Sequence, residues 1–296
     1  MKELPKGLIG DTLNQRHRRI ERGHIDDDTI PRLHVSSIIR SDSNNFFCPR
    51  EFVLRYMERQ ELAGAGIPPK FQLLYAVGHF YGEYIVQEFL TRNPQWAQYA
   101  WGDWTCPCKQ TKLTRVCYPE GQSCDKCDLP VDRYVEVDLF NPVRTVIGHA
   151  DLIFNVEGRY YIYEFKSIDR KDVVFNDIKR PLGDHLVQAS NYYYMLKSEG
   201  KDVSRVIRFV YVDRSMDGLY TQKPFKEVYA NAIPTKRLSA FYLRAKKARG
   251  AIKKGVLPER LCDSITCARA KQCSRAITCF ARTKKTIKRV PLIVTS

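Results

Sequence analysis

The chain has 296 residues, of which 44% are hydrophobic, and it carries 49 Lys or Arg against 33 Asp or Glu, a formal net charge of +16. This length and apolar content exclude a disordered chain and allow one large folded domain or two small ones. No apolar run approaches the roughly 18 residues that a bilayer span requires, and the first residues lack the apolar segment of a signal peptide. We therefore expect a cytoplasmic protein with no membrane partner. In a reducing cytoplasm, the ten cysteines favour metal or iron-sulfur ligation over five disulfides.

The predicted elements follow one another as an α/β chain with a cysteine-rich insert. Residues 1–33 are polar and are expected to form an arm or a peripheral helix. A helix is predicted from Pro49, because proline suits the first helical position, and a second helix is predicted at 71–90. Residues 101–127 hold five cysteines with little apolar periodicity and are predicted to fold around a metal. Apolar periodicity then predicts strands at 133–140, 146–154, 159–166 and 206–213, and helices at 184–197 and 235–254.

These expectations divide the chain into five regions. They are an N-terminal arm (1–33), a helical part (34–100), a zinc-ribbon-like insert (101–130), an α/β core (131–225) and a basic helical part (226–296). The last region carries 18 Lys or Arg against 3 Asp or Glu, and so holds nearly all of the excess charge. This favours a polyanionic partner, and DNA is the one that we expect. The alternative is a solvated basic tail.

A hairpin that otherwise looks buried keeps three charged residues. Its turn residues, Glu157 and Gly158, suit a tight hairpin because glycine tolerates positive φ. This turn places Asp151 directly opposite Glu164, with both side chains on one face of the sheet. Two carboxylates held so close repel unless a cation lies between them. Lys166, two residues after Glu164, shares that face.

This arrangement of charges suits hydrolysis of a phosphodiester. Mg²⁺ or Mn²⁺ on the carboxylates would lower the pKa of bound water, and Lys166 would position the water or stabilise developing negative charge. The alternative is a buried Glu-Lys pair beside a turn aspartate, without catalysis.

GlyHisAlaAsp at 148–151, followed by GluPheLys at 164–166, resembles the signature of the PD-(D/E)XK nuclease superfamily, in its RecB-like branch. Two further motifs resemble that branch. His79 is similar to its helical histidine, and Gln188 and Tyr192 are similar to its Gln-x-x-x-Tyr pair, which one helical turn places on one face. The resemblance implies a restriction-endonuclease-like α/β core that cleaves DNA.

The resemblance also implies a role for each matching residue. The ligands of Mg²⁺ or Mn²⁺ would be His79, Asp151, Glu164 and the carbonyl of Phe165. Lys166 would be catalytic, and Gln188 and Tyr192 would contact the DNA or steady the site.

Cys48 and a C-terminal cysteine group resemble a feature of one subset of this branch, which includes AddB-type helicase-nucleases and the nucleases of CRISPR adaptation. That subset uses such cysteines to hold a [4Fe-4S] cluster, which would join the two chain ends. The usual ending is Cys-x2-Cys-x5-Cys, but here Ala270 stands three residues before Cys273. The second ligand must therefore be Cys262 or Cys267. We expect the set Cys48, Cys262, Cys273 and Cys279. The set Cys48, Cys262, Cys267 and Cys273 stays open.

The cysteines of the insert offer five sulfurs for four positions around a metal. Cys-x2-Cys is a strong zinc half-site, and Cys-x-Cys is a tighter, less common partner for it. We therefore expect Zn²⁺ on Cys106, Cys108, Cys124 and Cys127, with Cys117 as the substitute. The alternative is a set of free surface thiols.

We expect a metal-dependent deoxyribonuclease, an exonuclease that hydrolyses phosphodiester bonds at the ends of single-stranded or duplex DNA. It would serve recombination, repair or replication and would meet the proteins of those processes. The chain has no Gly-x4-Gly-Lys-Ser/Thr motif, so it would act without its own ATP motor. The insert favours a phage or repair exonuclease, in a bacterial or phage-infected cytoplasm, over a CRISPR-adaptation-type nuclease. Two alternatives are a non-catalytic DNA-binding adaptor on a nuclease scaffold and a metal-containing RNA-binding factor, which would leave the charged hairpin unexplained.

Overall fold

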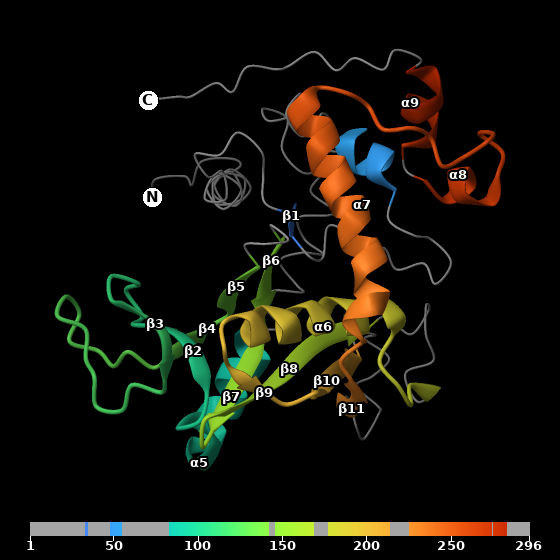
Figure 1. The fold of residues 1–296 in the computed structure, drawn as a ribbon. Coiled ribbons are helices and arrows are strands. Elements are labelled where there is room, and N and C mark those ends of the chain that lie inside the picture. The colour runs from blue at the N-terminus through green and yellow to red at the C-terminus, as the bar shows by residue number, and fades with distance from the viewer. Residues whose placement is uncertain are drawn as a thin grey trace, which may run out of the picture. The chain divides into compact units, whose positions relative to one another are not determined.

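The computed structural model in Figure 1 describes residues 33–34, 48–54, 83–141, 146–168, 177–213, 225–273 and 275–282. These residues form a mixed α/β protein with several sheets. The chain divides into two compact units. The first holds Met1–Leu33, Asn44–Leu73 and Lys236–Ser296, and the second holds His34–Ser43 and Leu74–Thr235. The charged hairpin and the cysteine-rich insert therefore belong to the second unit, and the remaining cysteines belong to the first.

The largest sheet of the second unit has five strands. Its strand order is β11-β10-β8-β7, with β9 beside β8. The strands are β7 (Leu152–Val156), β8 (Arg159–Ile168), β9 (Asp202–Val203), β10 (Val206–Asp213) and β11 (Phe225–Asn231). β10 runs parallel to β8, and this pairing needs a crossover, which α6 (Gly183–Ser198) supplies. The buried residues of α6 are Ala189, Ser190, Asn191, Tyr192, Met195 and Leu196.

Two three-stranded sheets complete this unit. One has the order β1-β6-β5 and the other β3-β2-β4. Their strands are β1 (Leu33–His34), β5 (Val137–Asn141), β6 (Val146–Ala150), β2 (Trp101–Thr105), β3 (Lys112–Cys117) and β4 (Arg133–Val135). A helix at 83–92 and the short helix α5 (Pro94–Ala97) precede β2.

One hydrophobic cluster joins the insert to the larger sheet. Val86 and Leu90 of the helix at 83–92 belong to it, together with Phe154 of β7 and Trp104 of β2. Trp104 is almost fully buried and donates its indole N–H to the carbonyl of Val116. The insert is therefore packed against the core that carries the charged hairpin.

The predicted register of the hairpin is confirmed. Leu152 pairs with Tyr163 at the end of the ladder, and Asp151 and Glu164 are the next residues beyond that pair. The turn residues Glu157 and Gly158 have φ of 52° and 84°, as a tight two-residue hairpin requires. The expected strand at 206–213 and helix at 235–254 also form at those residues.

Two predicted strands are interrupted, each at an acidic residue. The expected strand at 146–154 stops at Ala150 and resumes at Leu152, because the carboxylate of Asp151 accepts the N–H of Phe165 where the chain bends. The expected strand at 133–140 divides at Glu136 into β4 and β5. The predicted helix at 71–90 is described only from residue 83.

The first unit brings residues of its segments Asn44–Leu73 and Lys236–Ser296 together. A helix at 49–54 begins at Pro49, as predicted. The remaining helices are α7 (Thr235–Lys254), α8 (Ala268–Gln272) and α9 (Ala276–Ala281). Arg50 is almost fully buried, and it donates to the carbonyls of Pro258 at 2.7 Å and Arg282 at 2.8 Å. The helix at 49–54 is thereby fixed to the C-terminal segment.

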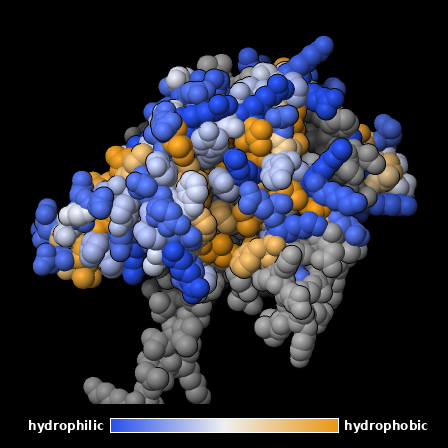
Figure 2. Space-filling view, turned by 90° about the horizontal axis from the view of Figure 1, so that it is seen from below, coloured by the Kyte–Doolittle hydropathy of each residue, from blue (hydrophilic) through white to orange (hydrophobic). Residues whose placement is uncertain are grey.

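Across the described ranges, no helix has the length and apolar character that crossing a membrane demands. The face shown in Figure 2 is mostly hydrophilic, with hydrophobic residues visible between the hydrophilic ones.

Candidate functional site

The charged residues of the hairpin meet where β7 begins beside β8. Glu164 is fully buried, and its Oε1 accepts a 2.6 Å hydrogen bond from Nζ of Lys166. Within the described ranges, no hydrogen-bond donor reaches the other oxygen, Oε2. A buried carboxylate oxygen without a partner costs free energy, which a bound cation would offset. Glu164 therefore offers one acceptor to a positive charge.

The electrostatics of this pair leave negative charge in excess. Burial, and next the charge of Asp151, raise the pKa of Glu164 to about 8. Burial alone would lower the pKa of Lys166, but Glu164 and Asp151 raise it above its ordinary value, so that the ammonium stays protonated. Lys166 is one positive charge beside two carboxylates, Glu164 and Asp151. A divalent cation bound here would stabilise the ionised form of both acids.

Asp151 sits at the bend between β6 and β7. Its Oδ2 accepts a 2.7 Å hydrogen bond from the backbone N–H of Phe165. The N–H and C=O of one strand residue point to the same side of the strand. The carbonyl of Phe165 therefore faces the edge of β8 at which Asp151 lies, where the sequence predicts a metal ligand.

Gln188 and Tyr192 are held together on α6. The Nε2 of Gln188 donates to the hydroxyl of Tyr192 at 2.7 Å. Tyr192 is fully buried, and burial and then Glu164 raise its pKa well above the ordinary value. The ring of Tyr192 lies on Gly148, so closely that a Cβ there would come within 2.3 Å of a ring carbon. Glycine is thus required at the start of GlyHisAlaAsp, because β6 approaches the ring directly.

The structure gathers six of the predicted residues around one place in the second unit. They are Asp151, Glu164, Phe165, Lys166, Gln188 and Tyr192. The seventh, His79, lies outside the described residues.

His185 and Tyr211 also lie beside these residues, although the sequence analysis did not select them. The Nδ1 of His185 lies 3.0 Å from the hydroxyl of Tyr211. Tyr211 stands directly beside Lys166 in the register of β10 and β8. Burial lowers the pKa of His185, the charge of Asp184 opposes this and the charge of Lys166 adds to it, so that the pKa is about 4. His185 is therefore neutral at pH 7. Its position three residues before Gln188 on one helix was the available signal.

Glu136 is a further carboxylate near the hairpin. Its side chain is 27% exposed. Burial, and next the charge of Asp151, raise its pKa to about 8, while Lys166 acts in the opposite direction. Glu136, which lies between β4 and β5, is therefore influenced by the same charged residues as Glu164.

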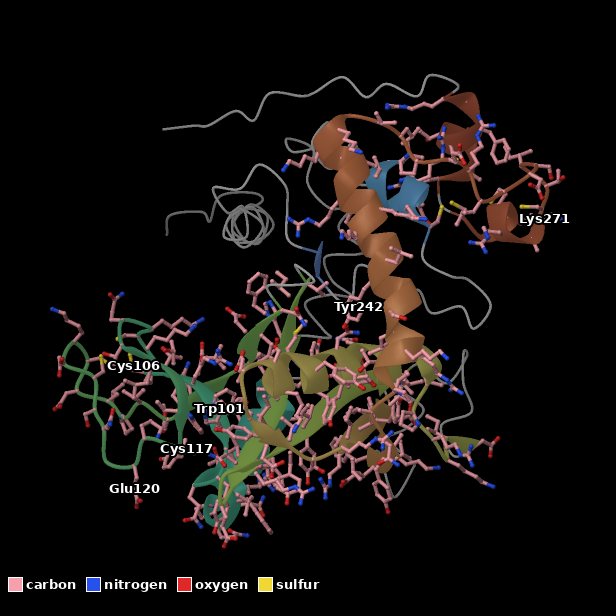
Figure 3. All side chains as sticks on the ribbon, viewed as in Figure 1. Trp101, Cys106, Cys117, Glu120, Tyr242 and Lys271 are labelled. Carbon is pink, nitrogen blue, oxygen red and sulfur yellow. The ribbon has the colours of Figure 1, made fainter. Side chains whose placement is uncertain are left out.

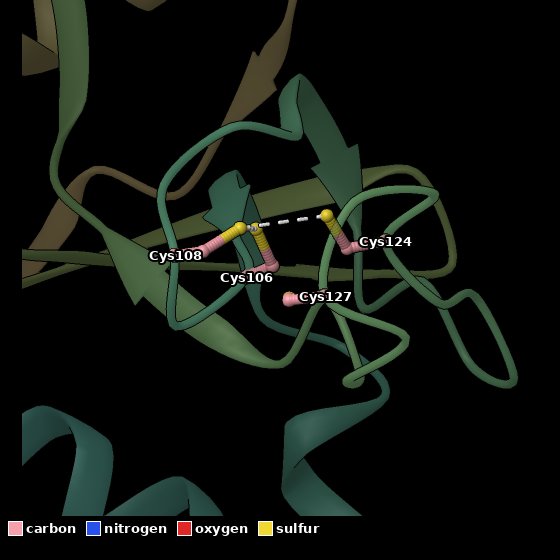
Figure 4. A group of neighbouring side chains, drawn as sticks. All are labelled: Cys106, Cys108, Cys124 and Cys127. Carbon is pink, nitrogen blue, oxygen red and sulfur yellow. Dashed lines mark hydrogen bonds between the residues drawn. The ribbon is translucent and has the colours of Figure 1, made fainter.

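Four cysteines of the insert form a group that could hold a metal ion. The Sγ atoms of Cys106, Cys108, Cys124 and Cys127 all lie within 4.8 Å of one another (Figure 4). Cys117, the predicted substitute, is outside this group. It pairs with Trp101 across β2 and β3, and Figure 3 shows it apart from Cys106.

Hydrogen bonds donated to the sulfurs favour the thiolate form, which suits this group to bind a cation. The backbone N–H of Thr111 donates to Sγ of Cys106 at 3.4 Å, and that of Lys126 donates to Sγ of Cys124 at the same distance. The hydroxyl of Thr111 donates to Sγ of Cys124 at 3.1 Å, and this bond is the main cause that lowers the pKa of Cys124 to about 6. Thiolate, the form that these donors stabilise, is the form that binds metal.

The other five cysteines all lie in the first unit. Nε of Arg50 donates to Sγ of Cys279 at 3.1 Å. Burial raises the pKa of Cys48, and Cys273 is among the charges that raise it further. Burial, and then the thiol of Cys267, raise the pKa of Cys262 to about 11, with Cys48 contributing. The early cysteine is therefore near the C-terminal group, while Cys262 and Cys267 are direct neighbours.

Comparisons with known proteins give little beyond this geometry. No protein-family model and no curated protein matches the chain. A solved structure titled "Crystal structure of SSO0001" matches with a TM-score of 0.48 and 16% sequence identity, over 95% of this chain and 100% of that one.

Proposed function

We propose that this chain is a metal-dependent deoxyribonuclease with a PD-(D/E)XK core of the RecB-like type, acting on DNA ends. One observation carries the proposal. Glu164 is fully buried opposite Asp151, with one oxygen on Lys166 and the other without a donor among the described residues. A purely structural Glu-Lys pair would not need a second carboxylate opposite it, since that carboxylate adds repulsion.

The residues at this place fit a hard divalent cation such as Mg²⁺ or Mn²⁺, because their ligand atoms are oxygens. Asp151, Glu164 and the carbonyl of Phe165 would hold it, with His79 as the ligand that the resemblance adds. The metal would supply a more acidic bound water and neutralise charge on the phosphate.

The protein's own residues account for positioning. The protonated Lys166 would contact the phosphate or its attacking water, where negative charge develops. Gln188 fixes the hydroxyl of Tyr192, and the Tyr192 ring supports β6 beneath the hairpin. Neutral His185 adds no charge to the site.

We assign the two cysteine groups to structural metals. Four thiolates gathered within 4.8 Å suit Zn²⁺. Cys48, Cys262, Cys273 and Cys279 would hold a [4Fe-4S] cluster, whose iron and sulfide atoms lie between its ligands and so require wider spacing than a single ion does. The basic residues of 226–296 supply the charge that DNA binding needs.

Digestion of end-labelled single-stranded and duplex DNA tests the proposal, with Lys166→Ala compared with Lys112→Ala. Lys112 is a matched control because its Nζ also pairs with a buried carboxylate, that of Asp103, at 2.7 Å. Wild type and Lys112→Ala should degrade DNA with Mg²⁺ or Mn²⁺ and not with EDTA. Lys166→Ala should lose at least about 100-fold in rate. If wild type binds DNA and cuts neither substrate, a non-catalytic DNA-binding role replaces the proposal.

A further inference from the structure

Asp151 occupies the junction of two antiparallel ladders. In the ladder of β5 and β6, Val137 pairs with Ala150. Glu136 and Asp151 are the next residues beyond this last pair. In the ladder of β7 and β8, Leu152 pairs with Tyr163, and Glu164 and Asp151 are the next residues beyond that pair. Asp151 thus lies between the two ladders, and the last pair of each ladder is followed by an acidic residue, Glu136 or Glu164.

The side chain of Glu136 is more buried than that of the next acid on its face. Its carboxylate is 27% exposed, and Asp138, two residues further along and on the same face of the hairpin, is 71% exposed. Both acids lie near Nδ1 of His149, at 3.9 Å for Glu136 and 3.5 Å for Asp138. Asp138 pairs with His149 and Val137 with Ala150, so Glu136 is the acid nearer to Asp151 along this ladder.

A second, independent observation indicates that a cation belongs here. Oε2 of Glu164 is buried without a donor from the described part of the chain. Lys166 bonds the other oxygen of that carboxylate. Three carboxylates therefore face one ammonium, and one of them has an acceptor that the described residues do not satisfy.

We propose that Glu136 is a third carboxylate of the metal site, and that it binds the divalent cation together with Asp151, directly or through a bound water. This inference rests on the proposed function, since it concerns the same site. Glu136 does not belong to the motifs that resemble the nuclease signature. Among the described residues, only the cysteine group of the insert gathers three or more ligand atoms within 4.8 Å. Glu136 would therefore turn toward the ion, which its partly exposed side chain permits.

Binding of Mn²⁺ in the absence of DNA tests the inference, measured by calorimetry and by electron paramagnetic resonance. Wild type is compared with Glu136→Gln and with Asp138→Asn. Asp138→Asn is the matched control because it removes one negative charge from the same face, beside the same histidine. We expect about 10-fold or more weaker Mn²⁺ binding in Glu136→Gln, and less than about 3-fold in Asp138→Asn, which only lowers the surface charge.

Two further measurements separate a metal ligand from a structural residue. Without metal, Glu136→Gln should melt no lower than wild type, because it removes repulsion between carboxylates. With Mn²⁺, its melting temperature should rise less than that of wild type. Glu136→Asp keeps the charge with a shorter reach and should bind Mn²⁺ with intermediate affinity, which supports the inference if Glu136→Gln does not fold.

The possible outcomes distinguish this inference from the proposed function. Equal Mn²⁺ affinity in wild type and Glu136→Gln overturns the inference, even if wild type cleaves DNA. Equal losses in Glu136→Gln and Asp138→Asn also overturn it, because a general charge effect then explains both. If Mn²⁺ binds wild type and Glu136→Gln weakens it, but no DNA is cut, the inference stands and the nuclease proposal fails.

Discussion

Replacing Gly148 by alanine should damage the site without touching any charged residue. The added Cβ would lie 2.3 Å from a ring carbon of Tyr192, whereas carbon atoms pack at about 3.5 to 4.0 Å. The ring must therefore move by more than about 1 Å. It is fully buried, and the bond from Gln188 holds its hydroxyl, so it cannot swing into solvent.

The expected loss of stability follows from this overlap. Overpacking a core costs about 1 to 3 kcal/mol, and the rigid surroundings of Tyr192 favour the upper value. Replacing glycine in a strand returns about 1 kcal/mol, because the unfolded chain loses freedom. The net cost is about 2 kcal/mol, which lowers the melting temperature of a unit of this size by about 4 to 8 °C. Cleavage should fall as well, because Tyr192 adjoins Glu164.

Thermal unfolding of Gly148→Ala beside Gly183→Ala measures this effect. Gly183 is a suitable control because a Cβ there meets nothing within 4 Å. A double-mutant cycle with Tyr192→Ala should remove most of the cost of Gly148→Ala, since the obstructing ring is gone. Equal melting of the two glycine variants, or an undiminished cost in the Tyr192→Ala background, would refute the reasoning.

Three further predictions concern the metals and the buried acid. Cys124→Ser should lower bound zinc, measured by mass spectrometry, from about one ion per chain to less than about half, and Cys117→Ser should leave it unchanged. The pKa of Glu164 is raised from 4.5 to about 8, so its contribution to stability is present below pH 4.5 and is lost as the pH rises through 8. Metal-free protein should lose about 2 kcal/mol between pH 6.5 and 8 from this group, and Glu164→Gln should lose less, as thermal melting across that range would show. Cys262→Ser should lose iron and visible absorption after anaerobic purification while Cys267→Ser keeps them, and the reverse result would make Cys267 the ligand.

The sequence was sufficient to predict the register of the hairpin, because Glu157 and Gly158 allow one tight turn and the turn determines every pair beyond it. It was not sufficient to show Glu136. The strands that bring Glu136 to Asp151 are joined between Asn141 and Val146, which pair with each other. Four residues lie between them, and a connection of that length does not determine a register from sequence alone. The place of Glu136, the proposed third carboxylate, therefore became evident only from the ladder.

A similar limit applied to the long strand expected at 146–154. Apolar residues lie on both sides of Asp151, so periodicity alone predicts one strand. The side chain of Asp151 divides it by accepting the N–H of Phe165. For the insert, the spacing of Cys124 and Cys127 was already informative, because two residues between cysteines bring both sulfurs to one ion.

The measurement that tests the central claim most directly is cleavage of DNA in which sulfur replaces a non-bridging oxygen of the scissile phosphate. If a cation held by Asp151 and Glu164 contacts that phosphate, Mg²⁺ should support cleavage of the sulfur-substituted DNA poorly, because it binds sulfur weakly, and the softer Mn²⁺ or Cd²⁺ should restore it. Lys166→Ala should stay inactive with every metal. Cleavage that continues in EDTA, or that Lys166→Ala retains, would contradict the account.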